Sequence, residues 1–158
     1  MYNKKEVLQK VDMLYNMWKE GSLGGEVMPE DANPHLDKSS VENYLYFTLP
    51  MALNYQRNSY KLWESALNTY NDKETNFVFN PKICINKTFE EVQYALVKYK
   101  VALQKQKQTE IWLFLCKTFV ELYDGDIRKL FDSLDNDVDK IRNFIQKENK
   151  KKFPYLSG

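Results

Sequence analysis

Histidine and cysteine, the side chains whose chemistry near neutral pH is most distinctive, are few in this sequence. The 158 residues include one histidine, His35, and two cysteines, Cys84 and Cys116. His35 lies in a loop-like stretch and is expected to be a surface imidazole. Cys116 lies in the most apolar segment and is expected to pack as a small core residue. Two cysteines are too few for a four-cysteine zinc or iron–sulfur site, and one histidine excludes any site that needs two. No GxGxxG, GxxxxGK[ST], HExxH or CxxC motif occurs. We therefore expect no metal and no cofactor.

Charge is nearly balanced overall, at +1, but not along the chain. Residues 1–80 carry 8 basic and 11 acidic residues, and residues 81–158 carry 15 and 11, so the net charges are −3 and +4. Lysines gather in two places in the second half: Lys98, Lys100, Lys105 and Lys107, then Lys147, Lys150, Lys151 and Lys152. Such clusters can follow a phosphate backbone or form a solvated helix face, and charge alone leaves both interpretations open.

The elements that would position these side chains are predicted to be helices throughout. Residues 3–19 place Val7, Val11, Leu14 and Trp18 on one apolar stripe, which is typical of an amphipathic helix. Glycines and prolines in residues 21–38 indicate a loop. We therefore divide the chain into an N-terminal helix (1–20), a loop (21–38) and a helical bundle domain (39–158).

Capping signals predict where helices begin in the bundle domain. Ser39 to Glu42 and Thr88 to Glu91 both fit the capping box, in which a Ser or Thr precedes a Glu by three residues. Pro50 should break or kink the first of these helices, so a second segment is expected over 51–70 and an irregular stretch over 72–87. Later helices are expected over 88–99, 107–123, 126–134 and 137–148. Residues 107–123 are apolar on most of their circumference, which predicts a central position in the bundle.

Three stretches resemble the helix-hairpin-helix DNA glycosylase superfamily, which includes endonuclease III and the 8-oxoguanine glycosylases. They are Leu-Pro-Met-Ala-Leu-Asn-Tyr-Gln-Arg-Asn-Ser at 49–59, the helix and Tyr-Asp-Gly-Asp-Ile turn at 104–127, and Phe-Pro-Tyr-Leu-Ser-Gly at 153–158. The third departs from the Leu-Pro-Gly-Val-Gly hairpin of the family, because Tyr155 and Ser157 stand where glycines are usual. The resemblance implies an orthogonal multi-helix bundle like the N-terminal part of that fold.

The resemblance also implies which residues would contact damaged or abasic double-stranded DNA. An amide from the first stretch would fill the gap left by an extruded base; Gln56 is the best match, with Asn54 and Asn58 beside it. Gly158 would contact phosphate in the hairpin, and the preceding lysines would add charge. The family's catalytic lysine and aspartate lie further along than Gly158, so we expect DNA binding without glycosylase or AP lyase activity. The DNA-binding residues implied are Gln56, Asn54, Asn58, Lys150, Lys151, Lys152 and Gly158.

Two other interpretations remain open at this point. The chain could be a helical protein–protein interaction module, or a self-sufficient DNA-binding remnant of the glycosylase fold. If the partners of helix 3–19 are missing, its apolar stripe should stay exposed or self-associate, which predicts a homo-oligomer. No signal peptide or membrane-length apolar run occurs, so we expect no membrane partner and a cytoplasmic protein.

Overall fold

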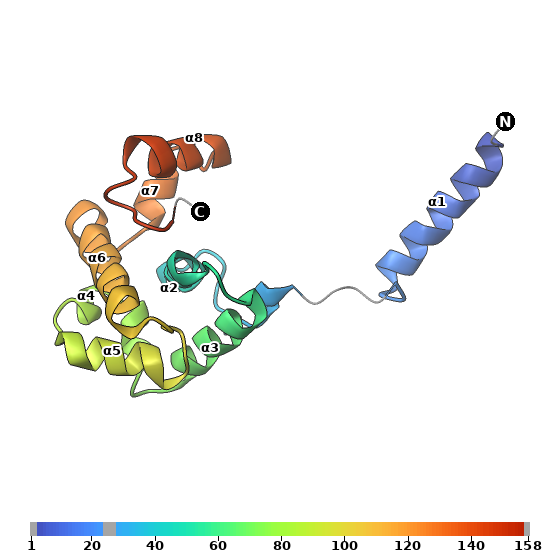
Figure 1. The fold of residues 1–158 in the computed structure, drawn as a ribbon. Coiled ribbons are helices and arrows are strands. Elements are labelled where there is room, and N and C mark those ends of the chain that lie inside the picture. Colours follow the sequence, from blue (N-terminus) through green and yellow to red (C-terminus); the bar gives the residue numbers. More distant parts are fainter. Residues whose placement is uncertain (1–2, 24–27, 157–158) are drawn as a thin grey trace.

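The computed structural model describes residues 3–23 and 28–156, and these residues form helices and no strand. The first helix, α1 (Lys4–Lys19), stands apart from the others, which pack into a bundle (Figure 1). The bundle contains α2 (Val41–Thr48), α3 (Ser59–Asn71), α4 (Pro81–Cys84), α5 (Phe89–Lys98), α6 (Lys105–Tyr123), α7 (Arg128–Ser133) and α8 (Val138–Asn143). Short 3-10 segments are η1 (Pro29–Asp31), η2 (Pro50–Leu53) and η3 (Asn76–Phe79), and a π-helical turn, η4, spans Phe144–Glu148. The prediction of an all-α fold is confirmed.

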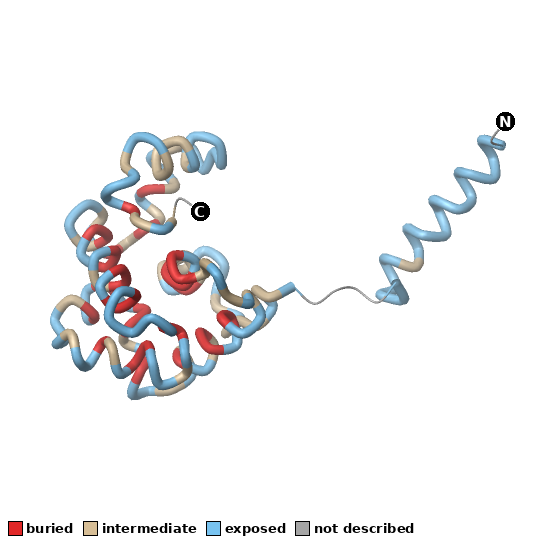
Figure 2. The backbone as a smooth tube through the Cα atoms, in the orientation of Figure 1, coloured by how far each residue is buried: buried red, intermediate tan, exposed pale blue. Residues whose placement is uncertain are grey.

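Helix α1 forms where the apolar spacing predicts it. The side chain of Asn3 accepts a hydrogen bond from the Lys5 amide, 3.1 Å away, and so caps the first turn. The helix ends at Lys19, and Gly21 follows with a φ of 71°, a conformation that glycine adopts readily. No residue of α1 is buried, and Figure 2 shows the helix exposed along its length. The apolar stripe is thus exposed, as expected.

The core of the bundle is built around the aromatic side chain of Tyr46 on α2. Its ring centroid lies 5.7 Å from that of Trp63, 5.5 Å from Tyr70 and 5.4 Å from Phe79. Its hydroxyl donates a hydrogen bond to the Ala32 carbonyl, 3.0 Å away. Figure 2 shows buried residues on α2, α3 and α6, around this centre. The hydroxyl contact also ties the segment that precedes α2 to the bundle.

Helix α6 packs against α4 and α5. Trp112 is fully buried, and its indole Nε1 donates to the Val78 carbonyl at 2.9 Å. The prediction of a central helix surrounded on all sides is wrong in one respect: Phe114 is 46% exposed and Leu122 is 45% exposed. Both side chains are partly open to solvent, so α6 is not covered all round.

One capping prediction is confirmed and the other is displaced by one residue. Thr88 Oγ1 accepts from the Glu91 amide and the Glu91 carboxylate accepts from the Thr88 amide, which is the full capping box. At the start of α2, however, Ser40 is the N-cap, and the expectation that Ser39 would cap is wrong. The Ser39 hydroxyl instead donates to the Asp37 carboxylate at 2.7 Å. Both serines carry a hydroxyl that could cap the helix, but the Ser39 hydroxyl is bound to Asp37 in the preceding turn, so Ser40 is the cap.

Two predicted boundaries around irregular segments are also wrong. The segment expected to be helical from Met51 is a 3-10 turn over Pro50–Leu53, then five non-helical residues, and α3 begins only at Ser59. Residues 72–87, expected to be irregular, contain η3 and α4. Pro81 occupies the first position of α4, where its missing N–H would have had no partner. Val78 and Phe79 of η3 are buried in the core of the bundle.

Candidate nucleic-acid interface

The candidate site is the non-helical turn 54–58, between η2 and α3. Asn54 Oδ1 accepts a hydrogen bond from the Ser59 hydroxyl at 3.1 Å. Asn58 is the N-cap of α3, and its Oδ1 accepts from the Lys61 amide, also at 3.1 Å. Both asparagines therefore use side-chain oxygens to hold the turn. Of the three predicted amides, only Gln56 has no hydrogen bond from its side chain in the described part of the chain.

Gln56 lies at the tip of the turn and is exposed, with a φ of 52°. This left-handed conformation is uncommon for a residue with a Cβ, and it costs roughly 1–2 kcal/mol relative to a right-handed one. A strained, exposed residue persists only when the surrounding structure holds it in place. The two residues beside it, Tyr55 and Arg57, supply that support.

Arg57 fastens one side of the turn to the loop between α5 and α6. Its Nη1 donates to the Val101 carbonyl at 2.6 Å and its Nη2 donates to the Lys100 carbonyl at 3.0 Å. Burial lowers the pKa of the Arg57 guanidinium, which nevertheless stays charged at any physiological pH because its ordinary value is so high. The guanidinium therefore makes two charge-assisted hydrogen bonds across more than 40 residues of sequence.

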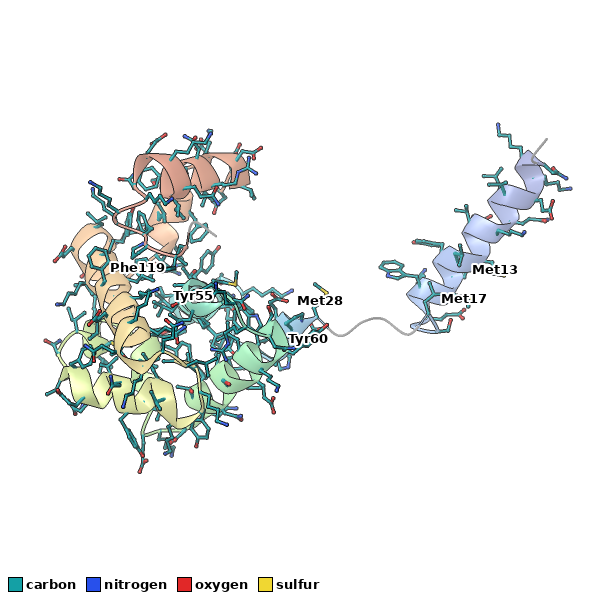
Figure 3. All side chains as sticks on the ribbon, viewed as in Figure 1. Met13, Met17, Met28, Tyr55, Tyr60 and Phe119 are labelled. Carbon is teal, nitrogen blue, oxygen red and sulfur yellow. The ribbon has the colours of Figure 1, made fainter. Side chains whose placement is uncertain are left out.

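Tyr55 fastens the other side of the turn. Its ring stacks on that of Tyr155, with centroids 5.0 Å apart and planes 25° apart. The ammonium of Lys107 lies 5.4 Å from the Tyr55 centroid and 5.1 Å from the Tyr155 centroid, within the range of a cation–π interaction. Tyr55 is half-buried, and Figure 3 labels it near the middle of the bundle in that view. The turn is therefore held by the loop after α5 through Arg57, and by α6 and the C-terminal segment through Tyr55.

The C-terminal segment places its lysines on the surface. Lys150, Lys151 and Lys152 are exposed, whereas Phe153 is fully buried. The Phe153 ring packs 6.4 Å from that of Phe119 and 6.1 Å from that of Phe144, centroid to centroid. Because Phe153 holds the segment, Tyr155 can reach the turn that contains Gln56. The structure thus brings together two of the stretches that carried the predicted DNA-binding residues, while Gly158 lies outside the described residues.

Ion pairs separate the lysines into two groups. Lys98 Nζ lies 2.7 Å from Asp72 and 2.9 Å from Glu74, and this pairing raises the pKa of Lys98. Within residues 3–23 and 28–156, the other lysines of the two predicted clusters form no ion pair with a carboxylate. Those lysines are Lys100, Lys105, Lys107, Lys147, Lys150, Lys151 and Lys152. Lys105 and Lys107 lie in the first turn of α6, where the helix dipole adds positive potential.

The two cysteine side chains are neighbours in the core rather than parts of an accessible site. Cys84 and Cys116 are both fully buried, and burial raises the pKa of the Cys116 thiol, so it is an unreactive core side chain. His35 is exposed and precedes α2 in the sequence, whereas the turn 54–58 follows α2. Over the described ranges, no group of three His, Cys, Asp or Glu side chains could hold a metal ion. In the same ranges, no helix is both long and apolar enough to cross a bilayer.

Sequence reasoning did not identify Arg57, Lys107 and Tyr155 as parts of this site. Arg57 stands between Gln56 and Asn58, so its proximity was a signal, but its partners are distant in sequence. Tyr155 has a φ of 63°, and its partners Tyr55 and Lys107 are distant from it in sequence. Comparison of the chain with protein-family models, with curated proteins and with solved structures gives no match.

Proposed function

We propose that this protein binds double-stranded DNA through the turn 54–58, with the Gln56 amide entering the duplex where a base is missing or mispaired. The observation that carries the proposal is the fixed, strained and exposed position of Gln56. Its side chain forms no hydrogen bond within the described residues, while Tyr55 and Arg57 are held on either side of it. An amide offers both a donor and an acceptor to an unpaired base. We assign no catalytic residue, and the glycosylase relationship itself remains part of the proposal.

Lysines that form no ion pair within the described ranges support phosphate contacts. Lys105 begins α6, two residues before the lysine that contacts Tyr55, and Lys100 lies in the loop held by Arg57. Lys150 to Lys152 precede the segment that stacks on the turn. Phosphate contacts position a protein on DNA without reading its sequence. The binding we propose therefore depends on the state of the duplex, not on its base sequence.

The proposal is tested with labelled duplexes that are intact or contain one abasic site, using fluorescence anisotropy over a range of salt. We expect binding at low salt that weakens as salt rises, because lysines displace condensed counterions. Gln56→Ala should reduce the preference for abasic over intact DNA roughly tenfold, since one or two hydrogen bonds of about 1 kcal/mol each are lost. Gln9→Ala on α1 is the matched control and should leave the preference unchanged.

Two results would contradict the proposal. One is an absence of duplex binding by the wild-type chain even at low salt. The other is a preference for abasic DNA that survives Gln56→Ala. Cleavage of damaged DNA by the purified chain would contradict our assignment of no catalytic residue.

A second candidate function, self-association, is favoured by the exposed face of α1. Val7, Leu8, Val11 and Leu14 are each about half exposed, and Trp18 is 67% exposed. Contiguous apolar surface of this kind marks an interaction site, and we propose a second copy of the chain as the partner.

Self-association is measured by light scattering on a sizing column at several concentrations. We expect an oligomer that Val11→Lys converts to a monomer, because the charge falls in the middle of the apolar stripe. Gln9→Lys, which adds the same charge to the opposite face of α1, should leave the oligomer intact. A wild-type chain that is monomeric at every concentration would remove this candidate and leave the DNA proposal standing.

A further inference from the structure

Three side chains from distant parts of the chain meet beside Gln56. Tyr55 comes from the turn, Lys107 from the first turn of α6, and Tyr155 from the C-terminal segment. We call this group the aromatic latch. Tyr55 is adjacent to Gln56 in sequence, so contacts that fix the Tyr55 side chain help to fix the backbone from which the Gln56 side chain extends.

The latch occupies a position that the backbone must be strained to reach. Tyr155 has a φ of 63°, a conformation that bulky side chains rarely adopt. It follows Phe153, which is fully buried, and Pro154, whose φ is restricted by its ring. Phe153 and Pro154 therefore restrict the backbone that places the Tyr155 ring against that of Tyr55. Its strain is retained because the stack and the lysine contact offset it.

Lys107 differs from the lysines around it. Its ammonium lies over two ring faces at 5.1 and 5.4 Å, whereas Lys105, two residues earlier, has no such contact among the described residues. The Tyr155 side chain also raises the pKa of Lys107, which keeps the ammonium charged. We therefore expect Lys105 and Lys107 to have different roles, although both are exposed lysines in the first turn of α6.

We propose that Lys107 and Tyr155 are positioning residues that hold the turn in the conformation in which Gln56 can enter a duplex, and that Lys107 is not a phosphate contact. This inference rests on the proposed function. In this proposal, the aromatic latch determines the preference for abasic over intact DNA, and the other lysines determine the overall affinity. If Lys107 instead contributed only electrostatic attraction, its loss would change the overall affinity and leave the preference unchanged.

The test compares Lys107→Gln with Lys105→Gln, a matched loss of charge in the same turn of α6. Lys107→Gln should lower the preference for abasic DNA about fivefold and leave the dependence of log K on log salt unchanged. Lys105→Gln should leave the preference unchanged and make that slope shallower by about 0.9, the value for one phosphate contact. Tyr155→Ala should behave like Lys107→Gln, and Tyr155→Phe, which keeps the ring, should retain most of the preference.

A second readout needs no DNA. Hydrogen exchange at the backbone amides of residues 55–57 should be faster in Lys107→Gln and Tyr155→Ala than in the wild type, with the far-UV circular dichroism unchanged. If wild-type DNA binding is undetectable, the proposed function fails, yet faster exchange would still support the latch as the support of the turn. Unchanged exchange in both variants would overturn the latch. A shallower salt slope for Lys107→Gln with an unchanged preference would also overturn it, because Lys107 would then be a phosphate contact.

Discussion

Replacing Arg57 with alanine should destabilise the fold, because its guanidinium links the turn 54–58 to the loop after α5. The bond from Nη1 to the Val101 carbonyl, 2.6 Å long, is partly buried, and the bond from Nη2 to the Lys100 carbonyl, 3.0 Å long, is exposed. Hydrogen bonds to charged groups contribute about 1.5–3 kcal/mol each. The exposed bond is expected to contribute no more than the lower value of this range. We therefore expect Arg57→Ala to lower the free energy of unfolding by about 3 kcal/mol.

The assay is thermal and urea unfolding followed by circular dichroism. A loss of about 3 kcal/mol corresponds to a decrease in Tm of roughly 6–12 °C for a chain of this length. Arg57→Lys should recover less than half of the loss, since a single ammonium does not reproduce the two-pronged geometry of a guanidinium. Lys61→Ala is the control, because the Lys61 side chain is exposed and forms no ion pair within the described ranges.

A decrease in stability of less than about 1 kcal/mol for Arg57→Ala would refute the reasoning, because it would equal the net value of one ordinary hydrogen bond. Full recovery by Arg57→Lys would refute it as well, since charge alone would then suffice. If the reasoning holds, Arg57→Ala should also lose the preference for abasic DNA, because the turn is released on one side.

Three further predictions concern the strain, the core and the acid stability of the fold. Gln56→Gly should raise the free energy of unfolding by up to about 1 kcal/mol, because glycine tolerates a positive φ, while abolishing the preference for abasic DNA; a clear destabilisation in urea would contradict this. Trp112→Phe should destabilise by about 1–3 kcal/mol more than Trp63→Phe, since only the Trp112 indole donates a hydrogen bond within the described structure; equal losses on urea unfolding would contradict it. Hydrogen bonds from the Lys87 ammonium and from the Thr88 amide lower the pKa of Glu91 from 4.5 to about 2. The contribution of Glu91 to the stability of the fold is therefore complete above pH 4.5 and is lost as pH falls toward 2. Glu91→Gln should therefore lower the Tm at pH 7, and the Tm curves of variant and wild type should converge near pH 2; parallel curves would exclude this linkage.

Short-range signals in the sequence predicted those parts of the fold that depend on neighbouring residues. The capping box at Thr88, the apolar stripe of α1 and the burial of Cys116 are all confirmed. The N-cap of α2 was missed by one residue, because Ser39 and Ser40 are chemically equivalent and only the Asp37 contact distinguishes them. Periodicity also extended a helix through residues 54–58, which the structure shows as the turn.

For the candidate site, the sequence by itself determined that polar amides follow an apolar segment and that lysines gather near the C-terminus. Only the tertiary structure decided that the Asn54 and Asn58 side chains hold the turn, whereas the Gln56 side chain makes no hydrogen bond in the part of the chain that the structure describes. It also decided that Tyr155 reaches Tyr55, 100 residues earlier in the chain. The physical reason is that capping and helical periodicity arise from hydrogen bonds and contacts within a few residues. The stack, the Arg57 bonds and the burial of Phe153 depend instead on how the helices pack around one core.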